Sequence, residues 1–408
     1  MTMDIVERFI NYAKIDTKSD PYSETKPSTM KQFDLAKVLL EELKSLGIED
    51  ACVDEKCFVY GHLESNTETS APTVGFIAHM DTAPDYSGTG VRPRIIENYD
   101  GGDIELGDGV VTKVSDFPAM KELKGKTLIV TDGSTLLGGD DKAGIAAIMD
   151  TLQYYREHPE VRHGRIAVAF TPDEEIGTGI HGFDIERFDA KFAYTMDGGQ
   201  VWMYCDETFN AASALVEIRG FSIHPGTAKD KMINASNVGI AFHNMFPGYM
   251  RPEHTEGRDG FIHLTRFEGS TDKAVMEYII RDHDAGKLEE KIALMQKAEA
   301  YINAQYGEGT CTLTITPQYR NMKEIVDLYP EVSRYAMDSI RELGYEPGIE
   351  AARGGTDGAQ LCFRGLPCPN LGTGDRNAHG RYEYVVVEEL RQSAELIRSI
   401  IGKVLKEA

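Results

Sequence analysis

The sequence predicts an α/β fold, in which a mixed sheet is flanked by helices and a second α+β domain is inserted into the chain. Three observations predict this. The 408 residues are more than one ordinary core holds. Short apolar runs alternate with a helical pattern over the first two hundred residues. From Thr208 onward the order becomes strand, helix, strand, strand, helix, strand, which is the ferredoxin-like order.

Four short apolar runs in the first part are typical of buried strands, because they are rich in β-branched and aromatic residues. They are Thr73–Ala78, Thr127–Val130, Ile166–Phe170 and Phe192–Thr195. Between the second and third runs, apolar residues from Ile145 to Tyr155 recur at the spacing of one helical face. Similar amphipathic patterns predict a helix at the N-terminus, one near 323–343 and one near 387–405.

The change of pattern sets the predicted domain boundaries. Residues 208–320 form the inserted ferredoxin-like domain, and residues 1–207 and 321–408 together form one discontinuous domain.

Composition excludes several classes of partner. Lys and Arg number 43 against 66 Asp and Glu, a net charge of −23, which repels nucleic acid and anionic lipid. No run of about 18 apolar residues predicts a membrane span. The N-terminus lacks the pattern of a signal peptide, and the six scattered cysteines include no C-x-x-C pair. We therefore expect a cytoplasmic protein with free thiols and no thiolate-bound zinc.

A cluster of polar residues follows each of the four apolar runs, and this placement predicts a ligand-binding site. In open α/β sheets, ligands bind beyond the carboxyl ends of the strands. The residues in these positions are His79 and Asp81, then Asp140 and Asp141, then Asp173, Glu174 and Glu175, and finally Asp197. His379, in the segment Thr373–Gly380, supplies a second imidazole from far along the chain.

The chemistry of these groups indicates metal ions. Three consecutive acids at a strand end repel one another unless a cation is present. His79 can bind a metal while Asp81 lies alongside it, because residues i and i+2 of an extended segment face the same way. In such a segment Glu174 and Glu175 point in opposite directions, so that one binds metal and the other acts as general base.

Two imidazoles and at least three carboxylates suit zinc, cobalt or manganese. Two such ions about 3.5–4 Å apart can clamp a carbonyl group and the attacking water together. The pattern thus predicts metal-assisted hydrolysis of an amide bond. Whether Asp140 or Asp141 binds the metal stays open at this level, because either could instead cap the following helix.

With these motifs in order, the sequence resembles the M20 family of metallopeptidases. The resemblance lies in HMDT, LLGGDDKAG, AFTPDEEIG, YTMDGG and NAHG. The segments ERFINYAKIDTKS, NAAS, HPGTAK and RGGTDGAQL further resemble the tripeptide aminopeptidases of that family. Gly139 stands where some relatives are expected to have Ala.

The resemblance implies two Zn²⁺ per chain, with Co²⁺ or Mn²⁺ as substitutes, and a zinc-exopeptidase-like catalytic domain with a lid. Asp140 would bridge the ions, and Asp141 would be its neighbour outside the ligand set. Glu174 would be the general base, and Asp81 a carboxylate that supports the ligands.

The same resemblance implies the remaining ligands and the substrate. His79 and Asp197 would complete one metal, and Glu175 and His379 the other. The substrate would be a tripeptide, cleaved after its first residue in the cytoplasm. Another amide hydrolase of the same family (a dipeptidase, carboxypeptidase or N-deacylase) is the alternative, and an inactive metal-binding or scaffold protein is a further one.

Substrate-binding candidates follow from the need to hold both charged ends of a short peptide. A peptide carboxylate favours an arginine fork, for which Arg281 and Arg353 are candidates, although Asp282 and Asp284 could pair with Arg281. His224 and Asn234 of the inserted domain could stabilise the developing oxyanion. Exposed faces of this domain could also pair two copies into a homodimer.

Overall fold

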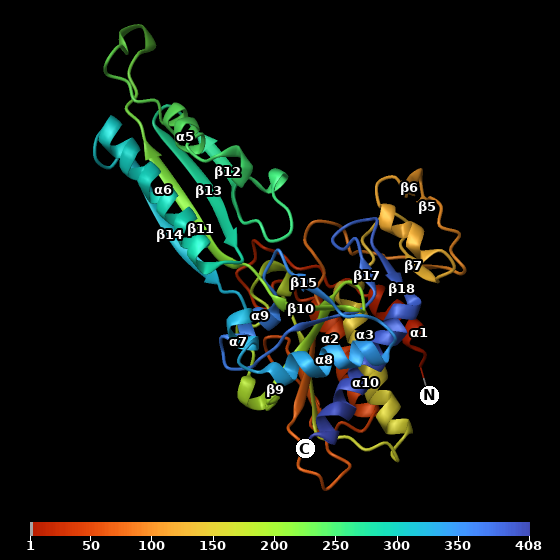
Figure 1. The fold of residues 1–408 in the computed structure, drawn as a ribbon. Coiled ribbons are helices and arrows are strands. Elements are labelled where there is room, and N and C mark those ends of the chain that lie inside the picture. The colour runs from red at the N-terminus through yellow and green to blue at the C-terminus, as the bar shows by residue number, and fades with distance from the viewer. Residues whose placement is uncertain (1–2) are drawn as a thin grey trace. The chain divides into compact units, whose positions relative to one another are not determined.

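The computed structural model describes residues 3–408, which form two compact units (Figure 1). The first unit holds the described residues up to Asp206 together with Glu324–Glu350 and Thr356–Ala408. The second holds Glu207–Lys323 and Ala351–Gly355. The short segment 351–355 therefore packs with the second unit, whereas the sequence placed it in the first.

The first unit is built on an eight-stranded mixed sheet with the order β1-β2-β8-β3-β9-β16-β10-β15. Its strands are β1 (Cys52–Val53), β2 (Val59–Leu63), β3 (Val74–His79), β8 (Ile166–Thr171), β9 (Phe192–Gly198), β10 (Met203–Glu207), β15 (Gly348–Ala351) and β16 (Asn370–Gly372). Neighbours β8, β3 and β9 run parallel, with Val74 opposite both Ile166 and Phe192. The carboxyl ends of these three strands therefore meet at one edge of the sheet, as the sequence predicted.

Helices pack on this sheet and on one another. Helix α3 lies against β3 and β9, helices α1 and α10 pack on α3, and α2 packs on β1 and β2. The helices of this unit are α1 (Ile5–Ala13), α2 (Gln32–Ser45), α3 (Gly139–Glu157), α4 (Ile185–Phe188), α8 (Pro330–Glu342), α9 (Asp357–Cys362) and α10 (Val387–Lys406). The predicted apolar face of α1, from Ile5 to Ala13, is buried in the core.

The helix predicted near 323–343 is interrupted. A short helix α7 (Lys323–Val326) precedes α8, and Pro330 starts α8 at a position where its missing N–H costs no hydrogen bond. No helix among residues 3–408 is long and apolar enough to cross a membrane.

The prediction for Thr127–Val130 was only partly correct. Strand β7 (Leu128–Val130) exists, but it pairs antiparallel with β18 (Tyr384–Val386) and β4 (Arg94–Ile96). These strands and β17 (Asp375–Arg376) form a separate four-stranded sheet, next to a hairpin of β5 (Ile104–Gly107) and β6 (Val110–Thr112). Asp140 therefore does not follow a strand of the main sheet; it reaches the site from the start of α3.

The second unit has one antiparallel sheet, with the order β12-β13-β11-β14, covered by two helices. Its elements are β11 (Asn210–Arg219), α5 (Ala235–His243), β12 (Phe261–Gly269), β13 (Lys273–Asp282), α6 (Ala285–Tyr306) and β14 (Cys311–Tyr319). Helices α5 and α6 pack on β13 around a core that includes Val216, Phe242 and Met295. The predicted ferredoxin-like order of elements is confirmed.

Short 3-10 helices complete the fold: η1 (Pro118–Leu123), η2 (Glu174–Ile176), η3 (Pro225–Thr227), η4 (Gly248–Met250) and η5 (Pro252–His254).

Candidate metal centre

His79 is the last residue of β3, and its side chain is buried. Its Nδ1–H donates to the backbone carbonyl oxygen of Asp81 at 3.0 Å. This hydrogen bond fixes the tautomer and leaves Nε2 as the nitrogen that can bind a metal ion. The Asp81 carboxylate lies at 3.5 Å from Nδ1, so the backbone of Asp81 is the nearer partner of the imidazole.

Asp140 lies at the beginning of α3, where its backbone is not helical. One carboxylate oxygen, Oδ1, lies 2.8 Å from Nε2 of His79. The other, Oδ2, lies 3.3 Å from Nε2 of His379. A single carboxylate thus faces both imidazoles, one through each oxygen, which is the arrangement that a ligand bridging two ions requires.

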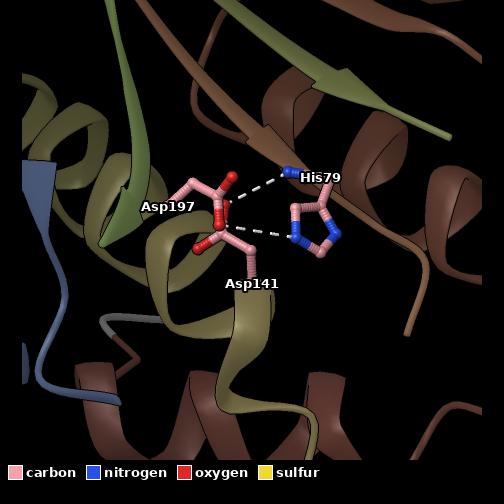
Figure 2. Close-up of side chains that lie close together, drawn as sticks. All are labelled: His79, Asp141 and Asp197. Carbon is pink, nitrogen blue, oxygen red and sulfur yellow. Dashed lines mark hydrogen bonds and ion pairs between the residues drawn. The ribbon is translucent and has the colours of Figure 1, made fainter. Parts of the chain in front are cut away.

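The neighbouring Asp141 is oriented differently. Its Oδ2 accepts from the backbone N–H of His79 and its Oδ1 from that of Gly144, each at 3.2 Å. Figure 2 shows this carboxylate close to His79 and Asp197. By proximity alone, His79, Asp141 and Asp197 could therefore also hold a metal ion. Because backbone amides already occupy both oxygens of Asp141, the geometry favours Asp140 as the bridging ligand.

Glu174 and Glu175 lie in the turn η2 that follows β8. The sequence had suggested an extended segment, which is wrong: Asp173 adopts a left-handed conformation (φ 61°) and the chain then makes a 3-10 turn. The backbone N–H groups of Glu174 and Glu175 donate to Oδ1 and Oδ2 of Asp81, at 3.0 and 3.2 Å. The Asp81 carboxylate therefore holds the turn that carries both glutamates.

The remaining predicted ligands converge on the same place. Oε2 of Glu175 lies 3.0 Å from Nε2 of His379, while Oε1 of Glu175 is buried without a hydrogen-bond partner. Oδ1 of Asp197, near the end of β9, lies 3.7 Å from Nε2 of His79. His379 comes from the loop between β17 and β18 and has a left-handed backbone (φ 68°).

These separations fit the binding of two ions. Two ligand atoms about 2.0–2.1 Å from one zinc ion at a tetrahedral angle are about 3.3 Å apart. The four nitrogen–oxygen distances of the site lie between 2.8 and 3.7 Å. The unpartnered oxygen of Glu175 is a second observation in favour of a ligand there.

The carboxylates of the site lie close enough together to raise one another's pKa. Burial, and after it the charge of Asp140, raises the pKa of Glu175 to about 7. Burial, and after it the charge of Asp197, raises the pKa of Glu174 well above its usual range. Hydrogen bonds to Asp140 and Glu175 raise the pKa of His379 to about 11. Bound cations would relieve the repulsion among these carboxylates.

A cavity of about 250 Å³ opens beside these groups within the first unit. Its lining includes Asp140, Asp197, Thr373, Asp375, Arg376 and Asn377. Arg376 is held by Glu389, whose Oε2 accepts from Nη2 at 2.7 Å. The cavity therefore offers carboxylates and loop backbone next to the candidate metal ligands.

The sequence did not reveal Glu383, which organises the loop before α3. The buried Glu383 carboxylate accepts from the backbone N–H groups of Leu137, Gly138 and Asp140, at 2.7, 2.8 and 3.1 Å. An acid inside the apolar run YEYVVV is the signal that could have indicated it.

The predicted substrate-binding residues all lie in the second unit. His224 is exposed and accepts from the N–H of Gly226, while Asn234 caps α5. Arg281 donates to the carbonyl oxygens of Ala212 and Ile280 and lies over Tyr319. The two acids that could have paired with it act elsewhere: Asp282 pairs with Lys291, and Asp284 caps α6.

Arg353 has its own set of partners. Its guanidinium donates to the carbonyl oxygens of Gly257 and Asp259 and to Oγ1 of Thr255, each at 2.8 Å. It also lies over the rings of Phe209 and Phe261. These contacts show how Arg353 is held within the second unit.

Carboxylates and imidazoles gathered at the edge of an α/β sheet are typical of metallopeptidases. Residues 138–403 match the peptidase family M20/M25/M40, and the chain belongs to this family.

Its relatives include proteins named Peptidase T. That of Alkaliphilus oremlandii (strain OhILAs) is 50% identical over 402 residues, and that of Geobacillus kaustophilus (strain HTA426) is 48% identical over 403. Both alignments cover 98% of each chain. The chain is thus similar to Peptidase T along its whole length.

Solved structures agree with the fold. The aminopeptidase PepT from Bacillus cereus ATCC 10987 superposes with a TM-score of 0.78 at 25% identity, covering 98% of both chains. A tripeptidase from Staphylococcus aureus superposes with a TM-score of 0.79 at 23% identity, also covering 98% of both chains. A mixed sheet flanked by helices, with a second α+β unit, is therefore confirmed as the fold class.

Proposed function

We propose that the chain is a metallo-aminopeptidase that removes the N-terminal residue from tripeptides. The observation that carries the proposal is the Asp140 carboxylate, whose two oxygens face the imidazoles of His79 and His379 at 2.8 and 3.3 Å. Proteins named Peptidase T, about half identical over 98% of the chain, support the tripeptide specificity.

We further propose that two Zn²⁺ ions bind here, with Co²⁺ or Mn²⁺ as substitutes. Asp140 would bridge them, with His79 and Asp197 on one side and Glu175 and His379 on the other. When bound, such ions polarise the carbonyl group that is cleaved and lower the pKa of a water molecule.

Glu174 is the proposed general base. Its backbone is fixed by Asp81, whereas its side chain makes none of the ligand contacts that Glu175 makes with His379. Glu174 would take the proton from the attacking water and then deliver it to the nitrogen of the departing peptide, as a carboxylate with a raised pKa can.

The second unit is the proposed lid. We propose that two of its residues, Arg281 and Arg353, bind the substrate carboxylate. His224 and Asn234 of the same unit would stabilise the developing oxyanion. The exposed side chain of His224 is free to meet a ligand, which supports its role in binding. Arg353 already donates to groups within the second unit, and these contacts support a structural role for it beside the proposed binding role. The catalytic domain is then the first unit.

A cytoplasmic location is proposed because all six cysteines are free thiols, five of them buried. A homodimer paired through the second unit is a further proposal, which the exposed Ile240 and Phe267 of that unit support. Sedimentation of the full chain would test this pairing.

A substrate panel tests the proposed activity. The purified chain is incubated with free tripeptides, dipeptides and N-acylated peptides, with and without a chelator. We expect release of the first residue from tripeptides, little cleavage of the other two classes, and loss of activity with the chelator. Preferential cleavage of N-acyl peptides would favour a deacylase of the same fold instead. Undiminished turnover after verified metal removal would refute the metal mechanism.

A further inference from the structure

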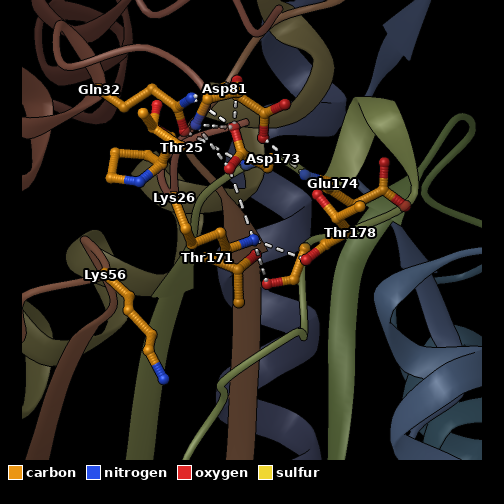
Figure 3. A network of polar contacts seen from close by, with 12 residues as sticks. Thr25, Lys26, Gln32, Lys56, Asp81, Thr171, Asp173, Glu174 and Thr178 are labelled. Carbon is orange, nitrogen blue, oxygen red and sulfur yellow. Dashed lines mark hydrogen bonds and ion pairs between the residues drawn. The ribbon is translucent and has the colours of Figure 1, made fainter. Parts of the chain in front are cut away.

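Asp173, which precedes the proposed base, is fully buried and holds a dense set of hydrogen bonds. Ser28 donates through its backbone N–H to both carboxylate oxygens, at 3.0 and 2.8 Å, and through its hydroxyl to Oδ1 at 2.5 Å. Nε2 of Gln32 donates to the same oxygen at 2.6 Å, and Nζ of Lys26 lies 3.5 Å from Oδ2. Figure 3 shows Asp173 joined to Gln32 and Lys26.

Gln32 binds Asp173 twice. Its Nε2 donates to the carboxylate, and its Oε1 accepts from the backbone N–H of Asp173 at 3.2 Å. One side-chain amide therefore fixes both the side chain and the backbone of the same residue. Asp173 has a positive φ of 61°, which is uncommon outside glycine, so its conformation depends on such contacts.

The next two residues continue this pattern. The N–H groups of Glu174 and Glu175 donate to Asp81, so three successive backbone amides are bound by side chains of two other segments. Any rotation of the chain at Asp173 would turn η2 and move both glutamates. Glu175 has little room for this, because its Oε2 lies 3.0 Å from His379.

We propose that Asp173 is a positioning residue for hydrolysis, and that the segment Lys26–Gln32 controls the reaction rate by holding it. This segment carries none of the proposed ligands and does not include the base. Its effect is on the direction of Glu174 and Glu175, since misplacing a reacting group by about 1 Å can cost about 10²-fold in rate. The inference rests on the proposed function for the roles of these two glutamates.

The variant Asp173→Asn tests the proposal in the full chain. In either orientation the new amide places its N–H₂ group against donors, which are those of Ser28 and Gln32 at one oxygen position and those of Ser28 and Lys26 at the other. This disturbs the turn while keeping the volume of the side chain. We expect kcat for a tripeptide to fall by about 10–10²-fold, with KM changed by less than about twofold. The visible absorption of the Co²⁺-loaded protein should change as well, because Glu175 moves relative to the ion.

Glu42→Gln is the matched control. Glu42 is also a largely buried acid, and it accepts from Nε of Arg8 at 2.7 Å and from the hydroxyl of Tyr12 between α1 and α2. We expect this variant to lower Tm while leaving kcat and the Co²⁺ spectrum unchanged. If Asp173→Asn behaves in the same way, Asp173 is only a structural residue and the proposal is overturned.

Gln32→Met keeps the test decisive if Asp173→Asn does not fold. It removes the double contact to Asp173 while leaving the donors of Ser28, and we expect a smaller loss of kcat with a shifted Co²⁺ spectrum. Unchanged kcat and spectrum would overturn the proposal. Failure of the proposed function is seen separately in the wild-type chain, which would then fail to cleave tripeptides, fail to bind Co²⁺, or both.

Discussion

Nε2 of His79 lies 2.8 Å from Oδ1 of Asp140, although the two residues are 61 positions apart in the sequence. The second oxygen of Asp140 faces His379, a further 239 positions along the chain. The adjacent Asp141 turns its carboxylate to backbone amides instead. The two aspartates thus contact different partners, and substitutions can test whether they also have different roles.

Asp140→Asn should reduce the bound metal to less than two ions per chain and abolish most activity, because an amide cannot bridge two cations. Asp141→Asn should retain two ions but lower the free energy of unfolding by about 1–3 kcal/mol, since an amide nitrogen would face the N–H of His79 or Gly144. Metal analysis by mass spectrometry and urea unfolding measure both effects. Metal loss in Asp141→Asn alone would reverse the assignment.

Glu174→Ala should keep two bound ions and lose activity by about 10²–10⁴-fold, which is the usual contribution of a general acid or base. The backbone N–H of Glu174 still donates to Asp81 in this variant, so the turn should persist. Steady-state kinetics on a tripeptide, with metal content measured on the same sample, test this. Turnover near that of the wild type would exclude Glu174 as the base.

Glu383→Gln should weaken metal binding by about 10–100-fold, as the loss of a residue that supports a ligand does. The three backbone N–H groups of Leu137, Gly138 and Asp140 lose their charged acceptor, and the segment that leads into α3 and carries Asp140 loosens. Competition with a chromophoric chelator gives the affinity. Glu388→Gln is a control, because within residues 3–408 the Glu388 carboxylate accepts only from the N–H of Thr127, just before β7. Equal loss in both variants would contradict a specific effect.

Gly139→Ala should destabilise the chain by about 1–3 kcal/mol through overpacking. A Cβ atom on Gly139 would lie 2.2 Å from Oδ1 of Asp375 and 2.7 Å from Cγ2 of Val385. Combining it with Asp375→Gly should recover part of the loss, because the closest atom is then absent. Thermal unfolding of the two single variants and the double variant gives the coupling, and strict additivity would show that Asp375 is not the obstacle. This contact also explains why Gly stands here in place of the Ala expected in some relatives.

Two local predictions failed for related reasons. The sequence placed Thr127–Val130 with the other apolar runs, but β7 pairs with β18, whose residues lie more than 250 positions away. It also treated Glu174 and Glu175 as extended, whereas Asp81 and Gln32 bind the backbone amides and impose a turn. Both outcomes depend on partners that are distant in sequence, which local patterns do not encode.

The sequence by itself determined the family, the types of residue in the site and the order of the elements, because strand and helix periodicity and motif spacing are local properties. It also identified three apolar runs whose polar ends meet, at His79, Glu175 and Asp197. The tertiary structure alone decided which oxygen faces which imidazole, that the backbone of Asp81 is the nearer partner of His79, and that Glu383 and Asp173 accept hydrogen bonds from backbone amides far away in the sequence. These relations arise from side chains that reach backbone amides across the fold, and only the packed chain brings such groups within hydrogen-bonding distance.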